Sequence, residues 1–184
     1  MQKEECISQI REAFKQCEKP SKERMSSWGG LDGDYVLKNW NHLKREQVRE
    51  FDSITSYHTE DLSYMSSDAL RYYLPGIMIL FLEKPDVVDY GAFIGLLSRL
   101  EAIFGCRVLN PNKIPLKFDT YRPIRFTQEQ LTSITNWTHQ IETLYDELEV
   151  EDEAYWFSEQ FERLRKAIGT SRNLVDYDIE LKRN

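Results

Sequence analysis

The chain has 184 residues, of which 41% are hydrophobic and 12% aromatic, so it is long enough and apolar enough to fold around one core. Its formal net charge of −7 at pH 7 argues against a general nucleic-acid or anionic-membrane surface, because both contacts need clustered Lys and Arg to neutralise phosphate. We therefore expect a basic protein partner, with no nucleic acid and no membrane.

Apolar residues in the first segment recur at steps of three and four. The stripe consists of Ile7, Ile10, Phe14 and Cys17. It predicts a helix over residues 2–18, which must end before Pro20. The opening MQKEECISQIREAF carries acids where a secretory signal would need an uninterrupted apolar region, so we expect a cytoplasmic protein with reduced thiols.

The next part of the chain has a weaker pattern. Residues 20–34 (PSKERMSSWGGLDGD) are rich in Gly, Ser and charge, which indicates a loop. The apolar spacing over residues 35–51 predicts one or two short helices. We interpret residues 52–65 as a connection.

The least polar stretch is SSDALRYYLPGIMILFLEK, residues 66–84. Ser66 or Ser67 can cap a helix that begins there. Pro75 would cost the interior of that helix about 3 kcal/mol, because proline removes a hydrogen bond and clashes with the preceding turn. We therefore predict a short helix over residues 67–74 that is kinked or broken at Pro75, followed by an apolar segment over 75–82 in the core. Its uncharged run is too short for the roughly 20 residues that span a bilayer.

Two further helices are predicted downstream, joined by a long irregular connection over residues 105–126. Apolar spacing predicts a helix over residues 88–104. Thr127 and Gln130 have the capping-box spacing at the start of another helix. A last helix is expected over residues 152–168, and the tail 170–184 is polar. The predicted fold is all-α, a compact bundle of five to seven helices forming one domain over residues 1–169.

Motifs for catalysis or cofactor binding are missing from the sequence. The three histidines are scattered, and none lies in a zinc-binding pattern. GGLDGD, residues 29–34, lacks the preceding strand of a phosphate-binding loop. We therefore assign no catalytic residue, no metal ligand and no cofactor.

One polar cluster borders the apolar run and offers a candidate ligand pocket. Its members are Tyr64, Arg71 and Tyr72, with further phenol and imidazole groups nearby. Helices that break between packed neighbours can leave a pocket. The alternative interpretation is the edge of the core, where phenol hydroxyls find partners at the rim.

Acidic residues are concentrated near the C-terminus. ETLYDELEVEDE, residues 142–153, holds seven carboxylates and no base. Within it we single out a partner-binding set: Glu147, Glu149, Glu151, Asp152 and Glu153. The alternative interpretation is a solvated helix end and loop, since acids also favour the first turn of a following helix.

SSDALRYYLPGIMILFL and FTQEQLTSITNWTHQIE together resemble an uncharacterised family of small bacterial proteins, over residues 61–141. In that family an AxRYYLP helix precedes a helix that starts with an FTPEQ-like motif, and Gln128 stands here in place of its proline. The resemblance implies a cytosolic helical domain of unknown activity, with no catalytic residues to carry over. Small acidic members of such groups look like immunity proteins, which neutralise a toxin by binding it.

Two functional hypotheses from different classes follow. The first is a non-enzymatic protein-binding domain, of immunity type, whose acidic surface binds a basic partner. The second is a small-molecule-binding protein or enzyme with its site near Tyr64, Arg71 and Tyr72. A nucleic-acid mimic would need acids spread along one face, and a single cluster supports it poorly.

Overall fold

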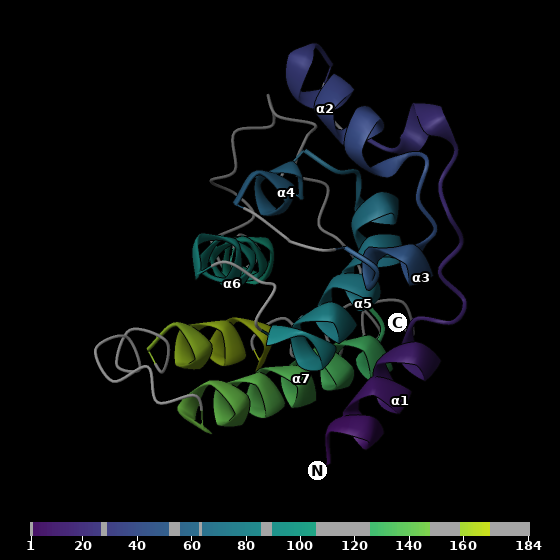
Figure 1. The fold of residues 1–184 in the computed structure, drawn as a ribbon. Helices are drawn as coiled ribbons and strands as arrows, with labels where there is room; N and C mark the ends of the chain where they lie inside the picture. The colour runs from purple at the N-terminus through teal and green to yellow at the C-terminus, as the bar shows by residue number, and fades with distance from the viewer. Residues whose placement is uncertain are drawn as a thin grey trace, which may run out of the picture.

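The computed structural model describes residues 2–26, 29–51, 56–62, 64–85, 90–105, 126–147 and 159–169, and these are mainly helical (Figure 1). The elements are α1 (Lys3–Ala13), the 3-10 helix η1 (Lys22–Arg24), α2 (Leu31–Trp40), α3 (Arg45–Val48), α4 (Ser56–Asp61), α5 (Ser67–Glu83), α6 (Tyr90–Gly105) and α7 (Gln128–Glu147). Residues 159–169 form a further helical segment. The described residues contain no β-strand, only an isolated bridge between Ser26 and Met65. The predicted all-α fold is confirmed.

Helix α5 occupies the centre of the molecule and packs against α1, α3 and α7 (Figure 1). Its first turn is capped by Ser66, whose hydroxyl accepts a hydrogen bond of 3.0 Å from the amide of Ala69. The helix continues unbroken through Pro75, so the predicted alternative of a break at that residue is wrong. Residues on both sides of Pro75 are buried, and this packing offsets the hydrogen bond that proline cannot make.

Gly76 follows Pro75 because α3 packs unusually close to α5 at this point. A β-carbon at residue 76 would lie under 3.0 Å from the backbone carbonyl oxygen of Arg45 and 3.1 Å from the β-carbon of Val48. Glycine is the residue that permits such an approach of two backbones. The pair of helix breakers therefore serves the packing of two helices rather than the end of one.

An aromatic cluster joins the C-terminal half of α5 to three other helical elements. The Phe81 ring lies 5.6 Å from Phe93 of α6 and 6.3 Å from Trp137 of α7, measured between centroids. The ring of Phe161 in segment 159–169 lies 5.8 Å from the Phe93 ring, again between centroids. The indole of Trp137 is fully buried and donates a 3.0 Å hydrogen bond to the carbonyl of Met78.

The predicted capping box at the start of α7 is confirmed. The amide of Gln130 donates to the Thr127 hydroxyl at 3.2 Å, and the amide of Thr127 donates to the Gln130 side chain at 3.0 Å. The side-chain amide of Gln130 also donates to the carbonyl of Ala13 and to the sulfur of Cys17, both at 3.3 Å. One residue therefore caps α7 and attaches it to the end of α1.

Several predicted boundaries differ from the structure. Helix α1 ends at Ala13 rather than near residue 18, because the chain tightens into a turn in which the amide of Cys17 donates to the carbonyl of Phe14. Helix α2 begins at Leu31, inside the predicted loop, after Gly30 adopts a positive φ of 76°. The predicted connection 52–65 contains α4. The connection expected after α6 lies outside the described residues over 106–125, as does the tail 170–184.

Candidate functional site

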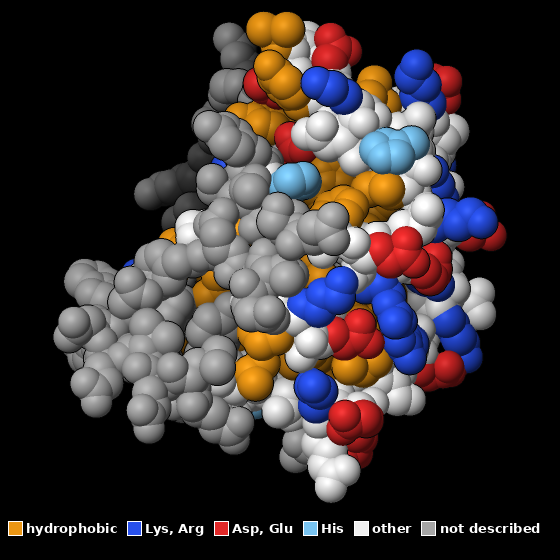
Figure 2. Space-filling model, viewed as in Figure 1, with side chains coloured by type: hydrophobic (Ala, Val, Ile, Leu, Met, Phe, Trp, Pro, Cys, Tyr) orange, Lys and Arg blue, Asp and Glu red, His pale blue; other side chains and the backbone are white. Residues whose placement is uncertain are grey.

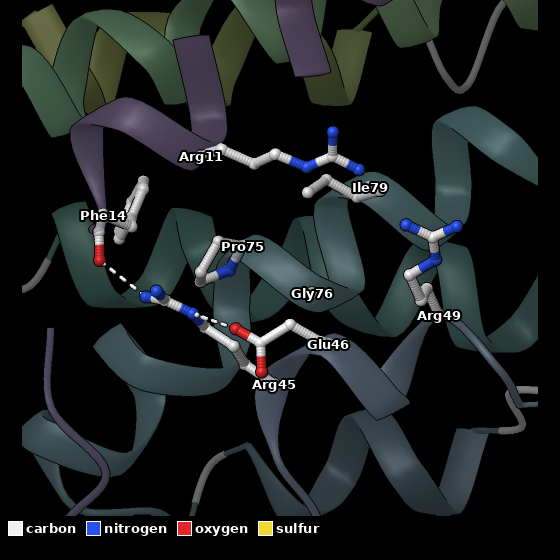
Figure 3. A pocket seen from close by; sticks show the side chains of 8 residues that line it. All are labelled: Arg11, Phe14, Arg45, Glu46, Arg49, Pro75, Gly76 and Ile79. Atoms are coloured by element: carbon white, nitrogen blue, oxygen red, sulfur yellow. Dashed lines mark hydrogen bonds and ion pairs between the residues drawn. The ribbon is translucent and has the colours of Figure 1, made fainter. Parts of the chain in front are cut away.

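A cavity of about 250 Å³ lies where α1, α3 and α5 meet, directly beside the Pro75–Gly76 pair (Figure 3). Three arginines and one glutamate share its lining with apolar groups. The lining residues are Arg11, Phe14, Arg45, Glu46, Arg49, Pro75, Gly76 and Ile79. A more open hollow, lined in part by Lys3 and Ile7, adjoins it and shares Arg11.

Arg45 is held rigidly in the wall of this cavity. Its Nη1 donates to the carbonyl of Phe14 at 2.6 Å, and its Nε donates to the Glu46 carboxylate at 2.9 Å (Figure 3). The guanidinium also lies over the Tyr72 ring, 5.7 Å from the centroid, which is cation–π geometry. These contacts join α3 to the end of α1 and to α5.

Arg11 and Arg49 stand at the mouth of the cavity, one from α1 and the other from the turn after α3. Figure 3 shows Arg11 reaching across from α1 and Arg49 extending from the region after α3 toward the same side as Ile79. Both guanidinium groups approach the Glu83 carboxylate at the end of α5, at 3.9 and 3.6 Å. These distances give electrostatic attraction but exceed those of a hydrogen bond. The side chains of Arg11 and Arg49 are 57% and 46% exposed.

The surface around these helices carries both signs of charge. Lys and Arg side chains alternate with Asp and Glu over α1 and α3, at the right of the view in Figure 2. Ion pairs at the surface include Lys15 with Glu12 beside the end of α1, and Arg24 of η1 with Asp68 of α5. Exposed pairs of this kind contribute little to stability, typically under about 1 kcal/mol.

Tyr64, Arg71 and Tyr72 do not line the cavity, although it lies beside Pro75 as the small-molecule hypothesis expected. Tyr72 is buried against Arg45, and its hydroxyl accepts from the Arg45 amide at 3.4 Å. Arg71 donates to Asp68 at 2.7 Å. Tyr64 lies in the turn after α4, where burial, followed by the negative charge of Asp32, raises the pKa of its phenol.

The phenol next to Tyr72 is part of the core. Tyr73 is fully buried, and its hydroxyl donates toward the carbonyls of Trp40 and Leu43 at 2.7 and 3.1 Å. Burial, followed by the neighbouring Tyr72, raises the pKa of Tyr73 well above its ordinary value. These contacts fit the core-edge interpretation, in which phenol hydroxyls find structural partners.

The acidic stretch begins in a described helix and continues beyond it. Glu142 is partly buried and accepts two hydrogen bonds from Arg165 of segment 159–169, at 2.6 and 3.3 Å. Glu147 is the last residue of α7. The other predicted partner-binding residues, Glu149, Glu151, Asp152 and Glu153, lie outside the described residues.

Within the described part of the chain, no group of three or more His, Cys, Asp or Glu side chains is arranged to hold a metal ion. The described helices include none with both the length and the apolar character needed to span a bilayer.

Sequence reasoning missed the arginines of the cavity. Arg45 and Arg49 are four residues apart, which places both on one side of a helical turn, but this spacing also occurs on ordinary solvated surfaces. The stronger signal was the Pro75–Gly76 pair inside an apolar run, because glycine there indicates a close backbone neighbour. Neither signal identifies Arg11, which is brought to the cavity by the packing of α1 on α5.

Comparison with protein-family models, curated proteins and solved structures finds no match for this chain.

Proposed function

We propose that this chain is a non-enzymatic protein-binding domain that uses its acidic C-terminal third to bind a basic protein. The observation that carries the proposal is the distribution of charge. Residues 126–184 hold 13 acidic and 6 basic side chains, whereas residues 1–60 hold 11 and 10 and residues 61–125 hold 7 and 8. The acidic excess of the whole chain is therefore confined to one third of it, and a concentration of negative charge favours association with a basic partner.

Two basic side chains of this third are already paired with carboxylates that lie outside residues 146–153. Arg165 is engaged by Glu142, and Arg163 pairs with Glu101 at 3.1 Å and with Glu159 at 3.8 Å. Two of the six basic residues are thus engaged by carboxylates outside 146–153. Carboxylates at this density repel one another unless water or a cationic partner surrounds them.

The competing explanation is neutralisation within the same chain. Residues 106–125 carry five basic and one acidic side chain. If they matched the acidic stretch, reversing its charges would destabilise the fold. If an external partner matched it, reversal would leave stability unchanged or improved and would slow association instead.

The resemblance to small bacterial proteins gives the proposal its specific form. An immunity-type role in the bacterial cytoplasm would make the partner a basic toxin. The alternative, a small-molecule site near Tyr64, Arg71 and Tyr72, retains support only from the position of the cavity beside Pro75, because the cavity has other lining residues.

The experiment has two stages. Tagged protein is purified from its native cells at low and high salt, and a salt-sensitive basic companion is identified. Association of that companion is then timed with wild type and with the triple variant Glu147→Lys, Glu149→Lys, Glu151→Lys. The matched control, Glu5→Lys, Glu18→Lys, Glu50→Lys, makes the same change in net charge at exposed sites elsewhere.

We expect the first triple variant to fold like wild type and to associate more slowly at low salt, with the difference shrinking at high salt. The control should retain most of the association rate. Unfolding of the first variant, association as fast as wild type at low salt, or recovery of no basic companion would each contradict the proposal.

A further inference from the structure

We infer that the cavity beside Pro75 binds a small organic carboxylate, whose charged end lies between Arg11 and Arg49 and whose apolar body rests on the cavity floor. This site is distinct from the acidic stretch and does not depend on the protein-binding proposal. It follows from how the three arginines of the cavity differ in their contacts (Figure 3).

Arg45 is not available to a ligand. Its side chain is only 22% exposed, and its guanidinium is engaged by Phe14, Glu46 and the Tyr72 ring. A ligand would have to replace a charge-assisted hydrogen bond to reach it. Arg45 therefore serves as a fixed wall that closes one side of the cavity.

Arg11 and Arg49 have hydrogen-bonding capacity left over. A guanidinium presents five N–H donors. Within the described residues, both side chains form long ion pairs with Glu83, at 3.9 and 3.6 Å, and neither makes a hydrogen bond. Two cations thus share one carboxylate at a distance that leaves their donors to water.

The charge balance of the site favours one additional anion. The lining holds three arginines and one glutamate, and Glu83 at the rim adds a second negative charge. Because Arg45 is paired with Glu46, one uncompensated positive charge remains among Arg11, Arg49 and Glu83. A single carboxylate would neutralise it, and the planar fork of a guanidinium matches the two oxygens of that group.

The floor and the size of the cavity define the rest of the ligand. Pro75, Gly76, Ile79 and Phe14 supply apolar contact beneath the arginines. The volume of about 250 Å³ lies below the roughly 300–1,000 Å³ of drug-sized sites, which favours a compact molecule over a nucleotide. The chemical class is thus a monocarboxylate with a small apolar body.

Benzoate is the probe for this class, and benzamide is its uncharged counterpart of the same shape. Binding of each to the full chain is followed by titration of backbone amide NMR signals at low salt. We expect saturable shifts with benzoate, centred on α1, α3 and α5, and much weaker shifts with benzamide. Inorganic phosphate serves as a third probe that offers charge without an apolar body.

Substitutions assign the binding to the two mouth arginines. Arg11→Gln and Arg49→Gln should each weaken benzoate binding by about tenfold or more, the loss expected for one charge-assisted hydrogen bond. The matched control is Arg163→Gln, which removes the same charge from a side chain of similar exposure, 49%, away from the cavity. Glu83→Gln should tighten binding, because it removes the anion that competes for both guanidinium groups.

Three results would overturn the inference. Benzoate and benzamide could bind equally well or not at all up to millimolar concentrations. Arg163→Gln could weaken benzoate binding as much as Arg49→Gln does, which would indicate a general charge effect. Phosphate could bind as tightly as benzoate, in which case the apolar floor contributes nothing and the carboxylate class is wrong.

Discussion

The backbone carbonyl of Arg45 occupies the space that any side chain at residue 76 would need. This contact explains why an apolar helix at the centre of the molecule carries glycine immediately after proline. The same approach of α3 to α5 places Arg45 at the cavity and brings Arg49 to its mouth. The packing of the core and the formation of the cavity therefore depend on the same residue.

Gly76→Ala should destabilise the protein by about 1–3 kcal/mol, the usual result of overpacking a well-filled interior. The sign of this stability change is informative, because helix propensity alone would make the alanine variant more stable by about 1 kcal/mol. The obstructing atom belongs to backbone, so relief requires α3 to move. Chemical denaturation of the variant and of wild type gives the difference between their free energies of unfolding.

The matched control is Gly169→Ala, since a β-carbon at residue 169 would meet no atom within 4 Å. It should change the unfolding free energy by less than 1 kcal/mol or so. Equal effects of the two substitutions, or a more stable Gly76→Ala, would show that α3 does not pack against α5 as described.

The parts of the fold that the sequence predicted are those with strong local signals. Helix α6 follows a regular apolar stripe, and Leu97 within that stripe is buried. The start of α7 follows from hydrogen bonds between residues three apart, Thr127 and Gln130, and the start of α5 from the Ser66 hydroxyl. Each of these features is decided within one or two helical turns of the chain, where periodicity and capping act.

The features that the sequence did not predict depend on distant contacts. Helix α4 has six mostly polar residues, so its sequence pattern does not predict a helix. Its packing against α2 and α6 stabilises it instead. Continuation of α5 through Pro75 depends in the same way on burial by its neighbours. The cavity requires Arg11 and Arg49, 38 positions apart in the sequence, to meet beside Glu83.

Stability should fall between pH 9 and about 11 because of Cys6. Burial, the largest cause, raises the pKa of this thiol from 9.0 to about 11 in the folded chain. Below pH 9 the thiol is protonated in both states, whereas between the two values the unfolded chain releases the proton and the folded chain retains it. The unfolded state is therefore favoured as pH rises through this window.

The measurement is the unfolding free energy at several pH values across that window, for wild type and for Cys6→Ala. The Cys6→Ala curve is subtracted from the wild-type curve because burial also raises the pKa of Tyr73, which adds its own dependence on pH. Cys6→Ala should be less stable at neutral pH, owing to the lost packing, but its stability should fall less steeply with pH. Parallel curves for the two proteins would mean that Cys6 does not titrate differently on folding.

The ion pair between Glu142 and Arg165 should be stronger than an ordinary surface pair. Its two hydrogen bonds measure 2.6 and 3.3 Å, the side chains are 23% and 20% exposed, and the guanidinium also lies 5.9 Å from the Phe161 ring centroid. Bidentate geometry and partial burial both strengthen such a contact. A double-mutant cycle with Glu142→Gln and Arg165→Gln should give a coupling energy of about 1 kcal/mol.

The pair Glu159 and Arg163 provides the reference within the same segment, at 3.8 Å with both side chains 49% exposed. Its cycle should give about 0.3–0.5 kcal/mol, and less at high salt. If the Glu142 cycle gives no more than this reference, Arg165 does not restrain Glu142. Glu142 would then belong with the proposed partner-binding carboxylates, and its reversal to Lys should slow association with a basic partner as strongly as reversal of Glu147 does. A coupling near 1 kcal/mol would instead place Glu142 in the structure and leave partner binding to the residues that follow it.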